Sequence, residues 1–328
     1  MNSDMLLRIK DLNTYFYTNE GVVKAVDNIS LTIPKGESVG LVGESGCGKT
    51  VTAYSVLQLV PRPPGKIVSG QIFFKGTDLL GLPEKEMRHV RGKKISMIFQ
   101  EPSSSMNPSF TIGNQIEEVI KFHQGGSTTQ VRNKAIEMLN AVRINDPRRM
   151  LSQYPHELSG GMLQRVMIAI ALSCKPDLLI CDEPTTALDV SMQAQVIKLL
   201  NDLRRETEAS FLFITHDLGV LSWVCTYAAV MYAGNIVEYS DIRNLINNPK
   251  HPYTQALIGA VPRLDRNNTA LRSIPGSVPN LIEPPEGCKF HPRCDRVRPI
   301  CRVQAPIPEE KGKGHWVSCF DISDGGIA

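Results

Sequence analysis

The sequence has little net charge and no long apolar run, and each absence excludes a class of protein. It carries 36 lysine and arginine residues against 33 aspartate and glutamate residues, which leaves a net charge of +3. A nucleic-acid-binding domain normally presents a strongly basic stripe, so we expect no nucleic acid partner. No segment approaches the roughly 18 consecutive apolar residues of a membrane helix, and residues 1–5 lack the pattern of a secretory signal. We therefore expect a cytosolic chain that does not cross a membrane.

The sequence also lacks an internal repeat, and its last part lacks regular apolar patterning. At 328 residues it exceeds the roughly 150 residues of an ordinary domain, which predicts one large core and at least one smaller unit. From Pro262 onward, 9 of the 22 prolines fall within the last 67 residues. This composition predicts an irregular C-terminal extension.

A phosphate-binding loop is the most specific motif that is present. Residues 43–50 fill the pattern G-x-x-x-x-G-K-[ST] directly after the apolar run Ser38–Val42. In such a P-loop the glycines let backbone N–H groups face phosphate oxygens, the lysine reaches the β- and γ-phosphates, and the threonine hydroxyl binds Mg²⁺. The sequence thus predicts binding of a nucleoside triphosphate with Mg²⁺. The predicted binding residues of this loop are Gly43, Glu44, Ser45, Gly46, Cys47, Gly48, Lys49 and Thr50.

The apolar periodicity around the P-loop predicts an α/β fold. Residues 6–33 alternate as half-buried antiparallel strands do, and short strands are expected at 67–74 and 95–99. Apolar positions with helical spacing between 131 and 142 indicate an inserted helical subdomain, after which strands at 178–182 and 210–214 flank a helix at 190–206. We expect a nucleotide-binding core at 1–100 and 174–240, a helical subdomain at 101–173, and a C-terminal extension at 241–328.

Polar side chains follow three of the expected strands, where a parallel sheet presents its ligand-binding edge. Asp182 and Glu183 end the strand at 178–182, His216 follows the next strand, and Gln100 closes the strand at 95–99. Asp182 would organise Mg²⁺ through its water shell, and Glu183 would polarise the attacking water as general base. His216 would contact the γ-phosphate. Each of these residues alone also fits an ordinary turn or surface position.

A second motif, Ser159-Gly160-Gly161, stands at the predicted start of a helix. A serine followed by two glycines exposes backbone N–H groups and a hydroxyl, which together bind anions. By itself the motif fits an ordinary helix N-cap equally well.

The P-loop, Gln100, Ser159-Gly160-Gly161, Asp182-Glu183, Asp189 and His216, in this order, resemble the ATP-binding subunit of an ABC transporter. The resemblance covers about residues 6–240. It implies a P-loop (RecA-like) ATPase core with an antiparallel β subdomain and an inserted α-helical subdomain. It also implies ATP hydrolysis, with Mg²⁺ held by Thr50, Gln100 and Asp182.

The resemblance implies an assembly as well. Each ATP would lie between the P-loop of one chain and residues Ser159 to Gly161 of a second ATPase subunit, with Asp189 in the loop between them. One such unit per chain makes that partner necessary, as a heterodimer or a homodimer. Gln100 and residues 101–108 would couple the site to two integral membrane permease subunits, which places the chain at the cytoplasmic face of the membrane. An aromatic residue near the N-terminus would stack on adenine, and Phe16 fits best beside Tyr15 and Tyr17.

A narrower resemblance points to the dipeptide and oligopeptide importers, and to their D-type ATPase. Met162 stands where the wider family has glutamine, and this variant is similar to the peptide branch. Residues 183–190, 251–254 and 287–294 carry the rest of that match. The implied function is ATP-driven import of small peptides delivered by an extracytoplasmic solute-binding protein. Nickel complexes are the alternative cargo. A soluble nucleic-acid ATPase and a sensor built on an inactive ATPase are the rival classes.

Four cysteines crowd into the C-terminal extension, with the spacing C-x₅-C-x₆-C-x₁₇-C. Buried thiols without a ligand, a zinc site and an iron–sulfur cluster are the alternatives, and the long gaps count mildly against zinc, whose ligands usually pair as C-x₂₋₄-C. The resemblance to oligopeptide importers favours a [4Fe–4S] cluster. Its predicted ligands are Cys288, Cys294, Cys301 and Cys319.

Overall fold

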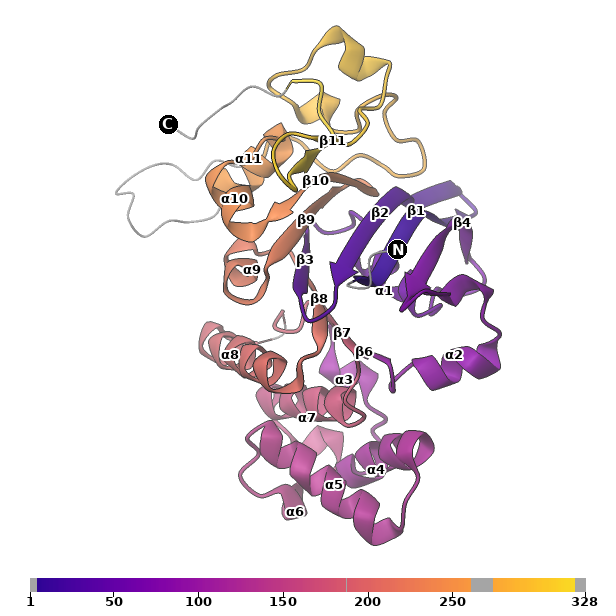
Figure 1. The fold of residues 1–328 in the computed structure, drawn as a ribbon, viewed down its shortest axis with the longest axis vertical. Helices are drawn as coiled ribbons and strands as arrows, with labels where there is room; N and C mark the ends of the chain where they lie inside the picture. Colours follow the sequence, from indigo (N-terminus) through magenta and orange to yellow (C-terminus); the bar gives the residue numbers. More distant parts are fainter. Residues whose placement is uncertain (1–4, 187, 261–273, 322–328) are drawn as a thin grey trace. The chain divides into compact units, whose positions relative to one another are not determined.

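The structure is a computed structural model, and it describes residues 5–186, 188–260 and 274–321. The chain divides into two compact units. We call the first, formed by 1–33, 38–80 and 214–328, the P-loop unit, and the second, formed by 34–37 and 81–213, the helical unit. The helices and strands of both units are drawn in Figure 1.

The P-loop unit begins with a four-stranded sheet in the order β2-β1-β4-β5. Its long strands β1 and β4 pair antiparallel from Leu7 opposite Phe74 to Phe16 opposite Gly65. The predicted alternation holds in β2, where Ile29 and Ile33 are fully buried. The strands are β1 (Met5–Thr18), β2 (Gly21–Pro34), β4 (Gly65–Phe74) and β5 (Thr77–Asp78).

Among its described residues, the P-loop unit also contains five strands of a second, larger sheet. Strand β3 pairs in parallel with β9, β9 pairs antiparallel with β10, and β10 pairs antiparallel with the short β12. The C-terminal extension was expected to be irregular, but it adds two short strands, of which β12 pairs with β10 and β11 pairs with β12. These strands are β3 (Ser38–Val42), β9 (Tyr227–Tyr232), β10 (Asn235–Asp241), β11 (Glu309–Glu310) and β12 (Trp316–Val317).

Four α-helices belong to the part of this unit that the structure describes. The first of them directly follows the P-loop and packs on β1, where the hydroxyls of Thr14 and Ser55 form a buried hydrogen bond of 2.8 Å. Two 3₁₀ turns, at 291–293 and 299–302, lie in the cysteine region. The helices are α1 (Lys49–Val56), α9 (Leu218–Val224), α10 (Ile242–Asn247) and α11 (Pro252–Gly259).

The helical unit joins parallel strands to a layer of helices. Strands β6 (Ile95–Ile98) and β7 (Leu178–Asp182) pair in parallel, and Ile98 lies opposite Cys181. Every residue of both strands is buried, as in a sheet that is covered on both faces. Strand β8 (Ser210–Thr215) begins in this unit.

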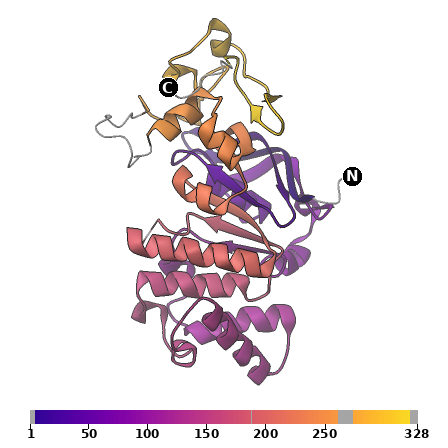
Figure 2. The same ribbon diagram turned by 60° about the vertical axis from the view of Figure 1, so that its left-hand side comes forward.

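The helices of this unit confirm the predicted helical insertion. Helix α5 buries Val131, Ala135, Met138 and Leu139, the positions whose spacing predicted it. Figure 2 shows α7 and α8 lying alongside each other. The helices are α2 (Glu84–Val90), α3 (Pro102–Ser105), α4 (Ile112–Gln124), α5 (Thr128–Ala141), α6 (Pro147–Met150), α7 (Gly160–Leu172) and α8 (Val190–Thr207).

These elements confirm the predicted α/β fold class, with an antiparallel sheet and a helical subdomain. In the part of the chain that the structure describes, none of the helices has the length and apolar character needed to span a membrane.

Candidate nucleotide-binding site

The P-loop connects the buried strand β3 to helix α1, as its pattern predicts. Gly48 is the N-cap of α1 and has a φ of 107°, in the region that favours glycine. A Cβ atom at Gly48 would lie 2.1 Å from a backbone carbonyl oxygen, and one at Gly43 would be equally close to another. Ser45 and Gly46 are exposed at the tip, whereas Cys47 is buried. Gly43 and Gly48 are therefore required, because the backbone of neighbouring segments lies too close to leave space for a side chain at either position.

The side chain of Lys49 folds back over this loop. Its Nζ donates hydrogen bonds to the carbonyl oxygens of Gly43 at 2.8 Å and Glu44 at 3.1 Å. Only 5% of Lys49 is exposed. The ammonium group is thereby held against the loop, and half-buried Thr50 follows it at the start of α1. This arrangement fits the binding of a polyphosphate with a divalent cation, because it supplies a cation, backbone N–H groups and a hydroxyl.

The three N-terminal aromatic residues differ in their surroundings. The Tyr15 hydroxyl donates to Asp27 at 3.0 Å, and burial together with the Asp27 charge raises the pKa of Tyr15 to about 12. Phe16 lies on the opposite face of β1, the face on which buried Thr14 reaches α1. Tyr17 is half exposed. The position of Phe16 on the α1 side of the strand agrees with its choice as the adenine-stacking residue, which stays a prediction.

The helical unit brings Gln100 and Glu183 together. Both follow parallel strands that end at the same edge, because Ile98 and Cys181 are paired. Gln100 Nε2 donates to Glu183 Oε2 at 3.3 Å, and the Thr186 hydroxyl donates to the same oxygen at 2.9 Å. Asp182, the residue before, is 1% exposed. The sequence did not predict that Thr186 holds the carboxylate.

Glu183 has an unusual backbone conformation. Its φ is 45°, in the left-handed region that residues other than glycine rarely adopt. Such strain costs on the order of 1–3 kcal/mol and concentrates at functional sites.

Met192 contacts both Asp189 and the signature motif, the name we use for Ser159-Gly160-Gly161. Ser159 is the N-cap of α7, and its hydroxyl accepts from the Met162 N–H group at 3.4 Å. Asp189 is the N-cap of α8, and its carboxylate accepts from the Met192 N–H group at 2.9 Å, which lowers the pKa of Asp189. The Met192 methyl group would lie 2.0 Å from a Cβ atom at Gly161. Gly161 therefore lies directly against the end of the flexible Met192 side chain.

The predicted site residues are distributed over both units. The P-loop, Phe16 and exposed His216 belong to the P-loop unit. Gln100, Asp182, Glu183 and Asp189 belong to the helical unit, as do Ser159, exposed Gly160 and Gly161.

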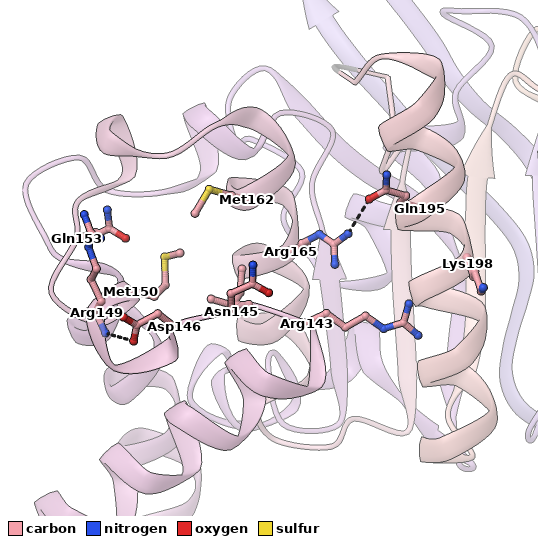
Figure 3. A pocket seen from close by; sticks show the side chains of 11 residues that line it. Arg143, Asn145, Asp146, Arg149, Met150, Gln153, Met162, Arg165, Gln195 and Lys198 are labelled. Carbon is pink, nitrogen blue, oxygen red and sulfur yellow. Dashed lines mark hydrogen bonds between the residues drawn. The ribbon is translucent and has the colours of Figure 1, made fainter.

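A cationic cavity of about 820 Å³ borders the signature helix within the helical unit. Figure 3 shows Arg165 donating to Gln195, with the Met162 thioether near the same space. Another basic residue of its lining, Arg143, pairs with Asp202 at 2.7 Å. This cavity was not predictable from the sequence, because α6, α7, α8 and the chain before α6 each contribute only a few of its residues.

The four cysteines of the extension line one small cavity in the P-loop unit, and all are free thiols. Burial raises the pKa of Cys288 and Cys294, and raises the pKa of Cys319 to about 11. Within residues 5–186, 188–260 and 274–321, no three His, Cys, Asp or Glu side chains are grouped as a bound metal ion requires. The donor set fits soft-metal chemistry, but the predicted cluster is not supported by a metal-binding geometry and stays a proposal.

This fold and this loop define a P-loop nucleotide-binding protein. The family described as ABC transporter matches residues 26–186, and the family described as oligopeptide/dipeptide transporter, C-terminal region, matches residues 237–301. The chain therefore belongs to the ABC transporter family, among its ATP-binding proteins.

Relatives of known name resemble almost the whole chain. A protein of Sinorhizobium fredii named as a probable peptide ABC transporter ATP-binding protein is 49% identical over 319 residues, which cover 97% of this chain and 95% of that protein. The dipeptide transport ATP-binding protein DppD of Bacillus subtilis is 45% identical, with coverage of 97% and 95%. The oligopeptide transport ATP-binding protein OppD of Salmonella typhimurium is also 45% identical, with coverage of 97% and 94%.

A solved structure is similar to the cassette part of the chain. It is an ATP-binding cassette determined as a dimer bound to ADP and phosphate. It has a TM-score of 0.65 and 27% identity, and covers 72% of this chain and 99% of that one.

Proposed function

We propose that the chain is the subunit that binds and hydrolyses ATP to power import of dipeptides or oligopeptides through a membrane permease. The observation that carries this proposal is the pairing of a complete P-loop with a C-terminal region that matches the oligopeptide/dipeptide transporter family. Full-length relatives named for peptide, dipeptide and oligopeptide transport support the cargo.

In the proposed reaction, Lys49 and the backbone N–H groups of the P-loop bind the β- and γ-phosphates. When bound, Mg²⁺ neutralises developing charge on the phosphates, and Thr50, Gln100 and Asp182 would hold it. Glu183 accepts a proton from the attacking water, and the hydrogen bonds from Gln100 and Thr186 orient its carboxylate. His216 would contact the γ-phosphate.

The site is proposed to be completed by a second ATPase subunit, in a heterodimer or a homodimer. Ser159, Gly160 and Asp189 are exposed at the starts of α7 and α8, and Val190 beside them is 84% exposed. Exposed N-cap groups suit the phosphates of a nucleotide bound to the partner, and the exposed apolar side chain beside them suits the protein surface of that partner. The solved dimer of a related cassette supports this arrangement. Two permease subunits at the cytoplasmic face and a solute-binding protein would complete the importer.

Reconstitution tests this function. The chain is expected to co-purify with integral membrane permease subunits, and vesicles containing the complete importer should take up labelled dipeptide only with ATP. Lys49→Ala should abolish ATP binding and uptake together. Uptake of a nickel complex without uptake of peptide would show that the cargo is a nickel complex. Co-purification of nucleic acid in place of permeases would refute the transport function.

We also propose that Cys288, Cys294, Cys301 and Cys319 hold a [4Fe–4S] cluster. Their shared cavity supports it, and so does the chemistry of four thiolates, each of which would bind one iron. Protein purified without oxygen should be brown and contain iron and acid-labile sulfide in near-equal amounts. Stoichiometric zinc without iron would favour a zinc site, and thiols free of both metals would refute a metal centre.

A further inference from the structure

The cysteine segment, which we define as residues 287–294, makes a direct contact with the P-loop. Arg293 Nη1 lies 2.8 Å from Glu44 Oε2, and Nη2 lies 3.1 Å from Oε1. This is a bidentate ion pair, the strongest arrangement between guanidinium and carboxylate. Glu44 is the second residue of the P-loop, so a residue 249 positions away holds its side chain.

The Arg293 side chain is fixed in this position by further contacts. Only 5% of it is exposed, and its Nε donates to the carbonyl oxygen of Pro275 at 2.8 Å. Its guanidinium also lies 5.8 Å from the ring centre of Tyr232. These contacts together aim the fork of donors at Glu44.

The backbone of Glu44 is held by residues of the same site. Its N–H group donates to the Tyr253 hydroxyl at 3.0 Å, and its carbonyl oxygen accepts from Lys49 Nζ at 3.1 Å. Arg293 thus acts on the residue whose carbonyl oxygen positions the phosphate-binding lysine.

The negative charge of Glu44 bears on phosphate binding by the loop. Glu44 places a carboxylate inside a loop that binds a polyanion, and an uncompensated carboxylate there would repel the phosphates. From these contacts we propose that Arg293 is a positioning residue for ATP binding. It neutralises Glu44 and holds its carboxylate in a fixed place, so that the loop stays attractive to phosphate. The inference rests on the proposed ATP-binding function and holds whatever ligand the cysteines bind.

A second ion pair of the same segment provides a matched control. Lys289 Nζ lies 2.8 Å from Asp27 Oδ2 and donates to the carbonyl oxygen of Ala233 at 2.9 Å. This pair ties the cysteine segment to the core of the unit at residues outside the P-loop. Lys289→Gln therefore removes one ion pair of the segment while the contacts of Arg293 with Glu44 and Pro275 remain.

The test measures equilibrium binding of MgATP to the full-length chain, with thermal unfolding of each variant as a check of folding. Arg293→Gln should raise the Kd about tenfold, the factor that corresponds to about 1.4 kcal/mol. Arg293→Lys keeps the charge but loses the fork, and should raise the Kd less. Lys289→Gln should leave the Kd within twofold of wild type.

The double variant Glu44→Gln with Arg293→Gln tests whether Arg293 acts by neutralising the Glu44 carboxylate or only by packing against it. Removing the unpaired carboxylate should restore most of the affinity that Arg293→Gln loses. In the assembled importer, Arg293→Gln should raise the KM for ATP with little change in kcat.

Three results would overturn the proposal. They are an unchanged Kd in Arg293→Gln, an equal loss in Lys289→Gln, and a double variant that binds no better than Arg293→Gln. A wild-type chain that does not bind MgATP would refute the proposed function itself, and this inference with it.

Discussion

Replacing Glu238 with glutamine should strongly destabilise the P-loop unit. The Glu238 side chain is fully buried in β10 and accepts three hydrogen bonds. Its Oε1 accepts from the Lys250 N–H group and from His315 Nε2, both at 2.7 Å, and its Oε2 accepts from the His251 N–H group at 3.0 Å. Both oxygens are therefore occupied by donors.

The cost follows from these contacts. Glutamine replaces one accepting oxygen with an NH₂ group, which faces a buried donor, and it removes the negative charge from the remaining bonds. A lost charge-assisted bond costs about 1.5–3 kcal/mol, and a buried donor left unpaired costs about 1–3 kcal/mol. We expect a loss of about 3–5 kcal/mol, which lies within the sum of these two costs.

The assay is thermal unfolding of the full-length chain. At about 2–4 °C per kcal/mol for a unit of this size, Glu238→Gln should lower the Tm by roughly 6–20 °C. Glu310→Gln is the control, because exposed Glu310 accepts one bond from Gly314 and should change the Tm by less than about 1 °C. A Glu238→Gln protein that unfolds within 2 °C of wild type would refute the argument from buried donors.

The remaining predictions concern the site and its acid stability. Glu183→Gln should lower kcat of the assembled transporter by about 10²–10⁴-fold while ATP binding persists, and near wild-type turnover would remove the general-base assignment. Gly48→Ala should abolish ATP binding, because the new Cβ atom would lie 2.1 Å from a carbonyl oxygen. A Cβ atom at Gly46 would have no atom within 4 Å, so the Gly46→Ala protein should bind ATP more tightly than the Gly48→Ala protein. Burial raises the pKa of Asp27, but the hydrogen bonds from Lys289 and Tyr15 and the charges of Lys289 and Lys24 together outweigh this, and the pKa falls below its ordinary value of 3.8. The Asp27 pair therefore stabilises the fold above that pH and is lost as the pH falls through the lower pKa. Asp27→Asn should flatten this part of an acid-unfolding curve.

The sequence predicts the parts of the site that depend on local pattern. The strand at 178–182 was expected from a short buried run, and it ends in Asp182 as the spacing indicates. Helix α5 follows from apolar positions at helical intervals. Parallel pairing of β6 and β7 then brings Gln100 and Glu183 to one edge, which agrees with the expectation that both lie at strand ends. Local periodicity suffices here because each element is continuous in the chain.

Contacts between distant segments were not predictable in this way. Nothing in the sequence around Arg293 indicates that its guanidinium reaches Glu44. Strand β12 has only two residues, too few to show a period. The left-handed backbone conformation of Glu183 is not indicated by the sequence either.

The pairing of β12 with β10 has a consequence for solubility. Trp316 and Val317 pair with Tyr239 and Glu238, so the extension covers a strand whose free N–H and C=O groups would otherwise be available to another molecule. The extension thereby prevents strand-to-strand association at β10, and this role does not depend on any ligand that its cysteines bind. A chain shortened before residue 309 would expose that strand and should self-associate as its concentration rises, even where its P-loop still binds nucleotide.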